Sequence, residues 1–76
     1  MRTEIAIGYV IRKSRKERGW FSSQLSRRVP ISRAYLCEIE RGDKVPSIAM
    51  LSDIAVALEM SPAELLHTIA DEMADA

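Results

Sequence analysis

Apolar residues recur at helical spacing along the 76-residue chain, and turn-forming residues separate the apolar stretches. In the middle of the chain, Leu25 and Val29 lie four residues apart, as on one face of a short helix. Pro30 must end that helix, because its ring removes a backbone hydrogen bond and biases the preceding residue away from helical angles. Leu36 and Ile39, three residues apart, then form the buried stripe of another helix, which ends at Gly42. The pattern therefore predicts two short helices joined by a turn.

A first helix is expected before this pair, starting near Thr3 and carrying Ile7 and Ile11 on its inner face. Gly19 is expected to end it as a left-handed cap. Gly8 lies inside this helix, where glycine costs about 1 kcal/mol against alanine. We therefore expect another element to pack closely against Gly8.

Serine residues mark the starts of later helices, because a serine hydroxyl accepts hydrogen bonds from the free N–H groups of a first turn. Ser32 precedes the second helix of the central pair, and Ser47 precedes a fourth helix. Ser61, with Glu64 three residues later, forms a capping box that predicts a fifth helix over about residues 62–74. The expected fold is all-α, with five helices.

The outer face of the third helix carries polar and small residues that a fully buried helix would not need. They are Arg33, Ala34, Cys37 and Glu38, followed by Arg41 and Lys44. A helix lying in the major groove of DNA would need them, since its N-terminal side chains reach base edges while flanking cations hold phosphates. The two central helices and their turn therefore predict a DNA-binding helix-turn-helix.

At these residues the chain resembles the phage-repressor/Cro-like (XRE-type) helix-turn-helix family. The resemblance runs from about Ile7 to Leu66 and is strongest in Ile31-Ser-Arg-Ala-Tyr-Leu-Cys-Glu-Ile-Glu-Arg-Gly42 and in the apolar pattern up to Leu58. It implies a compact, lambda-repressor-like domain with the helix-turn-helix at helices 2 and 3, usually dimeric, that regulates transcription. The short chain and its Ser-Arg-Ala-Tyr-Leu sequence also resemble restriction-modification controller proteins.

Four residues of the third helix are candidates for base contacts. The family position of Arg33 implies paired hydrogen bonds to guanine O6 and N7, with a solvated or phosphate-bound arginine as the alternative. Ala34 could meet a thymine methyl group. Tyr35 either packs on a base or sugar, or covers the edge of the core. Glu38 either accepts from cytosine N4, holds Arg33 in position, or repels phosphates and so disfavours wrong sequences.

A second set of residues is expected to hold phosphates, because helix N-termini and cations bind anions. The candidates are Ser22, Ser32, Arg41, Lys44 and Ser47. Arg41 and Lys44 are the stronger candidates of the five. A different role is implied for Arg15 and Glu40, which the family pairs as a structural salt bridge between helix 1 and the end of helix 3.

The start of the second helix departs from the family pattern of serine or threonine followed by glutamine. Phe21 stands at the cap position and Ser22 at the glutamine position. Either Ser22 becomes the cap or the helix end frays, although Gln24 still fits a reciprocal cap. Pro30 also replaces the usual glycine, which leaves the exact angle of the turn open.

The formal net charge of zero hides a strong asymmetry. Residues 1–44 hold all 11 Lys and Arg with five acidic residues, whereas residues 45–76 hold six acidic residues and no Lys or Arg. Such a dipole orients a molecule toward a polyanion, although two solvated faces of opposite sign are the simpler alternative. Together with the helix-turn-helix, the asymmetry favours binding to double-stranded DNA.

Composition and motifs exclude several other classes of protein. No apolar run approaches the roughly 20 residues of a membrane span, and no secretion signal is recognised. Cys37, the sole cysteine, fits a cytoplasmic protein and is read as a small contact residue, with redox sensing as the alternative. His67 lacks partners at metal-site spacing, and no nucleophile–base set is present. We expect a single domain over residues 1–76 with no metal, no cofactor and no enzymatic activity.

The fifth helix is expected to form a dimer interface, because its apolar stripe continues beyond the family core. The stripe consists of Leu66, Ile69, Ala70 and Met73. The alternative is that Ile69 and Met73 fold back on helix 1, for instance against Ile5. The expected function is a regulator that binds a palindromic operator as a homodimer with residues 33–41 in the major groove. The alternatives are an antitoxin-type interaction module with autoregulatory DNA binding, or a piece of a longer DNA-binding chain.

Overall fold

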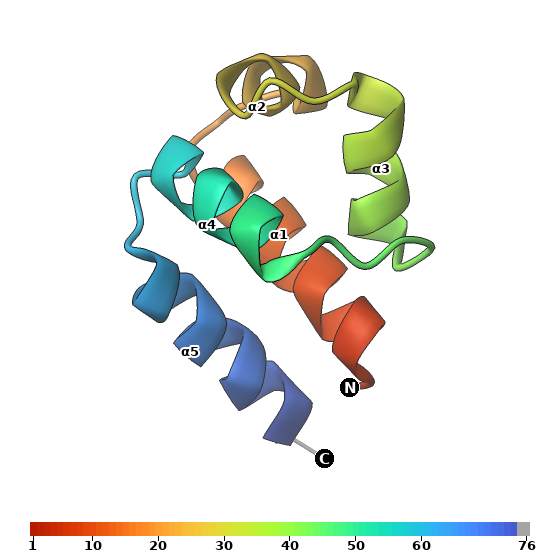
Figure 1. Ribbon diagram of the computed structural model, residues 1–76, viewed down its shortest axis with the longest axis vertical. Coiled ribbons are helices and arrows are strands. Elements are labelled where there is room, and N and C mark those ends of the chain that lie inside the picture. The colour runs from red at the N-terminus through yellow and green to blue at the C-terminus, as the bar shows by residue number, and fades with distance from the viewer. Residues whose placement is uncertain (75–76) are drawn as a thin grey trace.

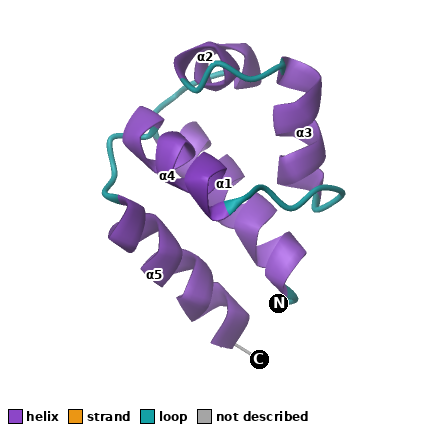
Figure 2. Ribbon diagram, viewed as in Figure 1, coloured by secondary structure: helices purple, strands orange, loops and turns teal. Residues whose placement is uncertain are grey.

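The computed structural model describes residues 1–74, and all regular structure in that part of the chain is helical (Figure 2). This arrangement confirms the all-α fold of five helices. The helices are α1 (Thr3–Glu17), α2 (Ser22–Arg28), α3 (Arg33–Arg41), α4 (Ile48–Ala57) and α5 (Pro62–Ala74).

α1 runs through the middle of the molecule, with α3 on one side of it and α5 on the other (Figure 1). α2 packs against α3, and α4 packs against α5. Each helix contributes at least one fully buried side chain to a common core, for example Ile11, Leu25, Leu36, Ile54 and Leu65. Burying one such side chain stabilises the fold by about 1.5–3 kcal/mol, and the shared core fixes how α2 and α3 are presented.

Three serine caps open helices where the sequence predicts them. The hydroxyl of Ser32 accepts from the N–H of the residue three positions later at 3.0 Å, and Ser47 does the same at 3.1 Å. Ser61 accepts from the N–H of Glu64 at 3.0 Å, and the Glu64 carboxylate accepts from the N–H of Ser61 at 3.4 Å. These reciprocal bonds confirm the capping box of α5.

The helices α1, α3 and α4 end with the same backbone motif. A left-handed residue follows the helix, and the next residue donates its N–H to the carbonyl five positions earlier. The left-handed residue is Gly19 after α1 and Gly42 after α3, with φ angles of 71° and 84°. After α4 it is Glu59, with a φ of 62°. The two glycine ends follow from the sequence, whereas the end at Glu59 carries no glycine signal.

The start of α2 differs from both alternatives that the sequence left open. Phe21 is the residue before the helix, and Ser22 is the first helical residue rather than the cap. The Gln24 side-chain oxygen accepts from the N–H of Phe21 at 2.7 Å, so half of a reciprocal cap forms without a serine. The helix is formed from Ser22 onward, and this bond and the complete burial of Leu25 hold its first turn in place.

Gly8 lies where the backbones of α1 and α3 meet. A Cβ atom added to Gly8 would overlap the carbonyl oxygen of Ile39 and would lie 2.6 Å from that of Glu40. Glycine therefore permits a contact that any side chain would prevent. This observation confirms the close packing expected at Gly8.

Candidate nucleic-acid interface

The turn between α2 and α3 presents α3 with one face buried and one face open. Leu36 and Ile39 are completely buried. The N–H of Ile31 donates to the carbonyl of Ser26 at 3.0 Å, so the turn around Pro30 is fixed by a backbone hydrogen bond. Pro30 itself is exposed, and it replaces the usual glycine without opening the turn.

The open face of α3 carries the residues that the sequence analysis selected. Arg33, Ala34 and Arg41 are exposed, and Cys37 is half-buried between them. Residues 33, 37 and 41 follow each other at four-residue intervals, so they form a continuous stripe along the helix. A polyanion that lies along α3 would meet this stripe first.

Arg33 is held by a residue of the preceding helix. Its Nε donates to the Oγ of Ser22 at 3.2 Å. Because Nε is engaged, the guanidinium plane is oriented while both terminal nitrogens remain available as donors. Glu38, which was one candidate for holding Arg33, makes no side-chain hydrogen bond to it within residues 1–74.

Two other candidates for base contacts are partly buried. Tyr35 packs against the core at its edge, as the second of its two predicted roles requires. The side chain of Glu38 is half-buried, and its carbonyl accepts from the N–H of Asp43 at the end of α3. Ala34 and Arg33 are therefore the two candidates that project fully from this face.

The predicted phosphate contacts surround the open face but differ in their present partners. The hydroxyls of Ser32 and Ser47 serve as helix caps, and each can still donate its proton. Arg41 pairs with Asp43 at 3.0 Å in an exposed ion pair. Lys44 is exposed and forms no ion pair within the described residues.

The predicted Arg15–Glu40 salt bridge is present and buried. Arg15 Nε and Nη2 donate to the two carboxylate oxygens of Glu40 at 2.8 and 2.9 Å, and Nη1 donates to the carbonyl of Trp20 at 2.8 Å. The side chains of Arg15 and Glu40 are 10% and 6% exposed. The hydrogen bond with Glu40 is the main reason why the pKa of Arg15 lies above its usual value. This pair joins α1 to the end of α3 and fixes the angle at which α3 is presented.

One exposed cation beside this face was missed by sequence reasoning. Arg12 lines a hollow together with Arg15, Ser22, Cys37, Glu40 and Arg41. The signal was present in the sequence, because Arg12 lies three residues before Arg15 and therefore shares its side of α1. Its proximity to α3 required the packing of α1 against α3.

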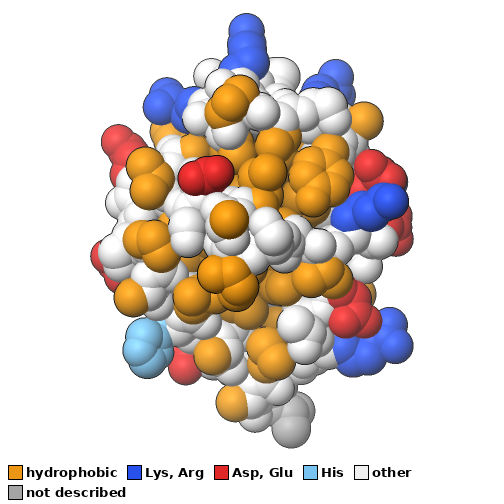
Figure 3. Space-filling model, in the orientation of Figure 1, with side chains coloured by type: hydrophobic (Ala, Val, Ile, Leu, Met, Phe, Trp, Pro, Cys, Tyr) orange, Lys and Arg blue, Asp and Glu red, His pale blue; other side chains and the backbone are white. Residues whose placement is uncertain are grey.

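Hydrophobic side chains gather on another face of the molecule, over α4 and α5 (Figure 3). The exposed large apolar residues of these helices are Ile48, Val56, Leu66 and Met73. Leu66 and Met73 are 39% and 42% exposed, and Ala70 is also exposed. Ile69 is only 4% exposed and belongs to the core of the monomer, so its assignment to a dimer interface was wrong. The folding back of α5 onto α1 explains this, because it buries the side of α5 that carries Ile69.

The described part of the chain contains neither a candidate metal site nor a membrane-spanning helix. No group of three or more His, Cys, Asp and Glu side chains within residues 1–74 could hold a metal ion. None of the helices within residues 1–74 combines the length and the apolar content that a membrane span requires.

Comparison with known proteins adds independent information on this arrangement. Residues 11–65 match the sequence pattern of the family HTH_3, which is described as helix-turn-helix. The chain is similar to SinR, an HTH-type transcriptional regulator of Bacillus subtilis (strain 168), with 36% identity over 67 residues. That match covers 87% of this chain and 57% of SinR. The chain spans 57% to 61% of the length of the first curated relatives that it matches.

Two solved structures share the fold over nearly the whole chain. ClgR, the clp gene regulator of Corynebacterium glutamicum, has a TM-score of 0.89 and 32% identity, with 100% of this chain and 99% of that chain covered. The restriction-modification controller protein C.Esp1396I, a tetramer in complex with its natural 35 base-pair operator, has a TM-score of 0.88 and 25% identity, with 99% of each chain covered. The similarity to controller proteins that the sequence indicated is thus confirmed.

Proposed function

Because the chain belongs to the helix-turn-helix family HTH_3, we propose that it is a transcriptional regulator that binds double-stranded DNA with α3 in the major groove. The observation that carries this proposal is the open face of α3, with Arg33 anchored to Ser22 at its N-terminal end. The relatives named above are transcriptional regulators, and C.Esp1396I was solved with its operator. A regulator of this kind is not an enzyme, and it acts in the cytoplasm where the DNA is.

The geometry of Arg33 favours recognition of guanine. An arginine reads guanine by donating two hydrogen bonds to O6 and N7. In this chain Arg33 is exposed, and beyond the bond from Nε to Ser22 its two terminal nitrogens have no hydrogen-bond partner among residues 1–74. Ala34 follows as a small residue that fits beside a thymine methyl group. We place Tyr35 and Glu38 beside the base contacts of Arg33 and Ala34, because both residues are half-buried in the protein.

The phosphate contacts would position α3 without reading sequence. Lys44 is the first candidate, because it is exposed and has no ionic partner among the described residues. Arg41 would exchange its exposed pair with Asp43 for a phosphate, which costs little because surface ion pairs are worth about 0–1 kcal/mol. The hydroxyls of Ser22, Ser32 and Ser47 would donate to the same backbone.

The regulator is proposed to act as a homodimer through the outer side of α5. Leu66, Ala70 and Met73 form an exposed apolar strip. In the proposed dimer, the same strip of a second copy would cover it. Ile69 supports this surface from within the core rather than touching the partner. A two-fold pair would place two copies of α3 in successive major grooves about 34 Å apart, which suits a palindromic operator.

One arginine variant and one lysine variant test the DNA contacts. The probe is a duplex that the wild-type protein selects from a random-sequence library, with each base pair then changed in turn. Arg33→Ala should reduce discrimination at one base pair by about 1–3 kcal/mol, while Lys44→Ala should weaken binding to all sequences alike. Equal loss on all duplexes for both variants would reduce Arg33 to a phosphate contact. Failure of the wild type to bind any duplex at low salt would favour an antitoxin-type interaction module instead.

The dimer is tested by Leu66→Asp combined with Met73→Asp, measured by sedimentation. Because both side chains are exposed, the variant should stay folded but become monomeric and lose tight binding to the full operator. Thr68→Asp is the control and should remain dimeric, because Thr68 is exposed on the same helix but does not line the hollow formed with Leu66 and Ala70. A double variant that remains dimeric would remove α5 from the proposed assembly.

A further inference from the structure

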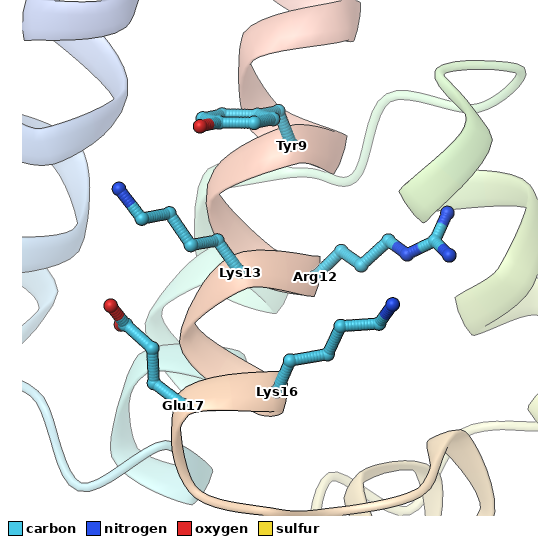
Figure 4. Close-up of a pocket in the computed structure, with 5 residues that line it drawn as sticks. All are labelled: Tyr9, Arg12, Lys13, Lys16 and Glu17. Atoms are coloured by element: carbon cyan, nitrogen blue, oxygen red, sulfur yellow. The ribbon is translucent and has the colours of Figure 1, made fainter.

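The outer face of α1 carries cations that the helix-turn-helix does not account for. Figure 4 shows five side chains that line a shallow hollow along this helix, namely Tyr9, Arg12, Lys13, Lys16 and Glu17. All five are exposed. Three cations and a single carboxylate therefore lie within about two helical turns on this face.

The side chains of this face extend in two directions. Lys13 and Glu17 extend toward α5, whereas Arg12 and Lys16 extend toward α3 (Figure 4). Lys13 lies beside the single carboxylate of the group, and its Nζ is 5.9 Å from the centre of the Tyr9 ring. The charge of Lys13 is therefore partly compensated within α1.

Arg12 and Lys16 lack such compensation. Their side chains form no ion pair and no hydrogen bond with any group of residues 1–74. They lie four residues apart on one side of a helix, where like charges repel each other. An anionic partner would remove this repulsion.

The pair is also continuous with the open face of α3. Arg12 lines the hollow on the outer face of α1, and it also lines the second hollow with Arg15, Ser22, Cys37, Glu40 and Arg41. The one carboxylate of this second hollow, that of Glu40, is neutralised by its pair with Arg15. An anionic chain that leaves the edge of α3 on this side would therefore pass Arg12 and then Lys16. The two residues are separated by about 6 Å along the helix axis, which allows them to hold neighbouring charges of one strand.

We propose that Arg12 and Lys16 bind the sugar-phosphate backbone of duplex DNA outside the base pairs that α3 reads. The inference rests on the proposed function and extends its footprint onto α1. Charge complementarity and continuity with the α3 face support phosphates as the ligand. Lys13 lines the same hollow but extends toward α5, away from the α3 side, so we leave it out of this contact (Figure 4).

The test compares Arg12→Ala combined with Lys16→Ala against the matched control Lys13→Ala. Affinity for the selected duplex is measured as a function of salt, with the duplex either carrying about ten flanking base pairs at each end or trimmed to the footprint of α3. Each lost phosphate contact should reduce the slope of log K against log salt by about 0.9, hence by nearly two for each protomer on the long duplex. Lys13→Ala should change the slope by much less, and Arg12→Lys combined with Lys16→Arg should preserve it.

The outcomes separate this inference from the proposed function. Wild-type binding with an unchanged slope in the Arg12→Ala, Lys16→Ala variant would overturn the inference alone and leave this face to an acidic protein partner. A slope loss as large for Lys13→Ala would also overturn it, because the effect would then report net charge rather than contact. Changed base preference in the double variant would assign the pair to sequence reading instead. A wild type that binds no duplex would refute the proposed function itself.

Discussion

The buried pair of Arg15 and Glu40 offers a sharp test of how α3 is held. Replacing Arg15 with methionine keeps much of its apolar length but removes three hydrogen bonds, two to Glu40 and one to the carbonyl of Trp20. The carboxylate of Glu40, which is 6% exposed, would then be left without its counter-charge. Leaving one charge of a buried pair unpaired costs about 3–5 kcal/mol.

This loss is large for a protein of this size. At about 0.05–0.15 kcal/mol per residue, a 76-residue domain has a free energy of unfolding of roughly 4–11 kcal/mol. Arg15→Met should therefore unfold the protein or bring it close to unfolding. Arg15→Met combined with Glu40→Leu removes both charges, so it should be more stable than Arg15→Met alone by about 2 kcal/mol or more.

The assay is urea unfolding followed by circular dichroism, without DNA. The matched control is Arg41→Met, because Arg41 and Asp43 form an ion pair of similar length, 3.0 Å, whose side chains are 60% and 58% exposed. This control should lose no more than about 1 kcal/mol. The reasoning fails if Arg15→Met costs no more than the control, or if the double variant loses the sum of its two single losses.

Three further changes test the packing and the helix ends. Gly8→Ala should destabilise the fold by about 1–3 kcal/mol, because the added Cβ would overlap the carbonyl oxygen of Ile39. This loss should outweigh the better helix propensity of alanine, and a higher melting temperature for the variant would contradict the packing. Glu59→Gly should raise the melting temperature, because the left-handed conformation at this position costs any residue other than glycine about 1–2 kcal/mol. Glu59→Ala is the control and should give no such gain. Ser61→Ala should lower the free energy of unfolding by about 1 kcal/mol, measured by thermal unfolding, because the cap of α5 is removed. Ser61→Asp should retain most of the stability, since aspartate can also cap a helix. Equal losses for the two variants would exclude the missing cap as the cause.

The positions of the helices follow from the sequence because the signals that set them act over a few residues. The capping bonds of Ser32, Ser47 and Ser61 each join residues three positions apart, so the sequence carries both partners side by side. Gly19 and Gly42 likewise mark helix ends through their own backbone freedom. The Arg15–Glu40 pair, whose members are 25 residues apart, was predicted only through the family resemblance.

Tertiary packing decided the features that depend on residues distant in the chain. Arg33 is oriented by Ser22 and Arg12 joins the α3 face only because α1 and α2 pack against α3. The apolar stripe of α5 satisfies either a core or a dimer contact, and the folding of α5 against α1 places Ile69 in the core while leaving Met73 exposed. Periodicity shows that a helix has an apolar side, but the direction of that side relative to its neighbours is fixed by the packing of all five helices.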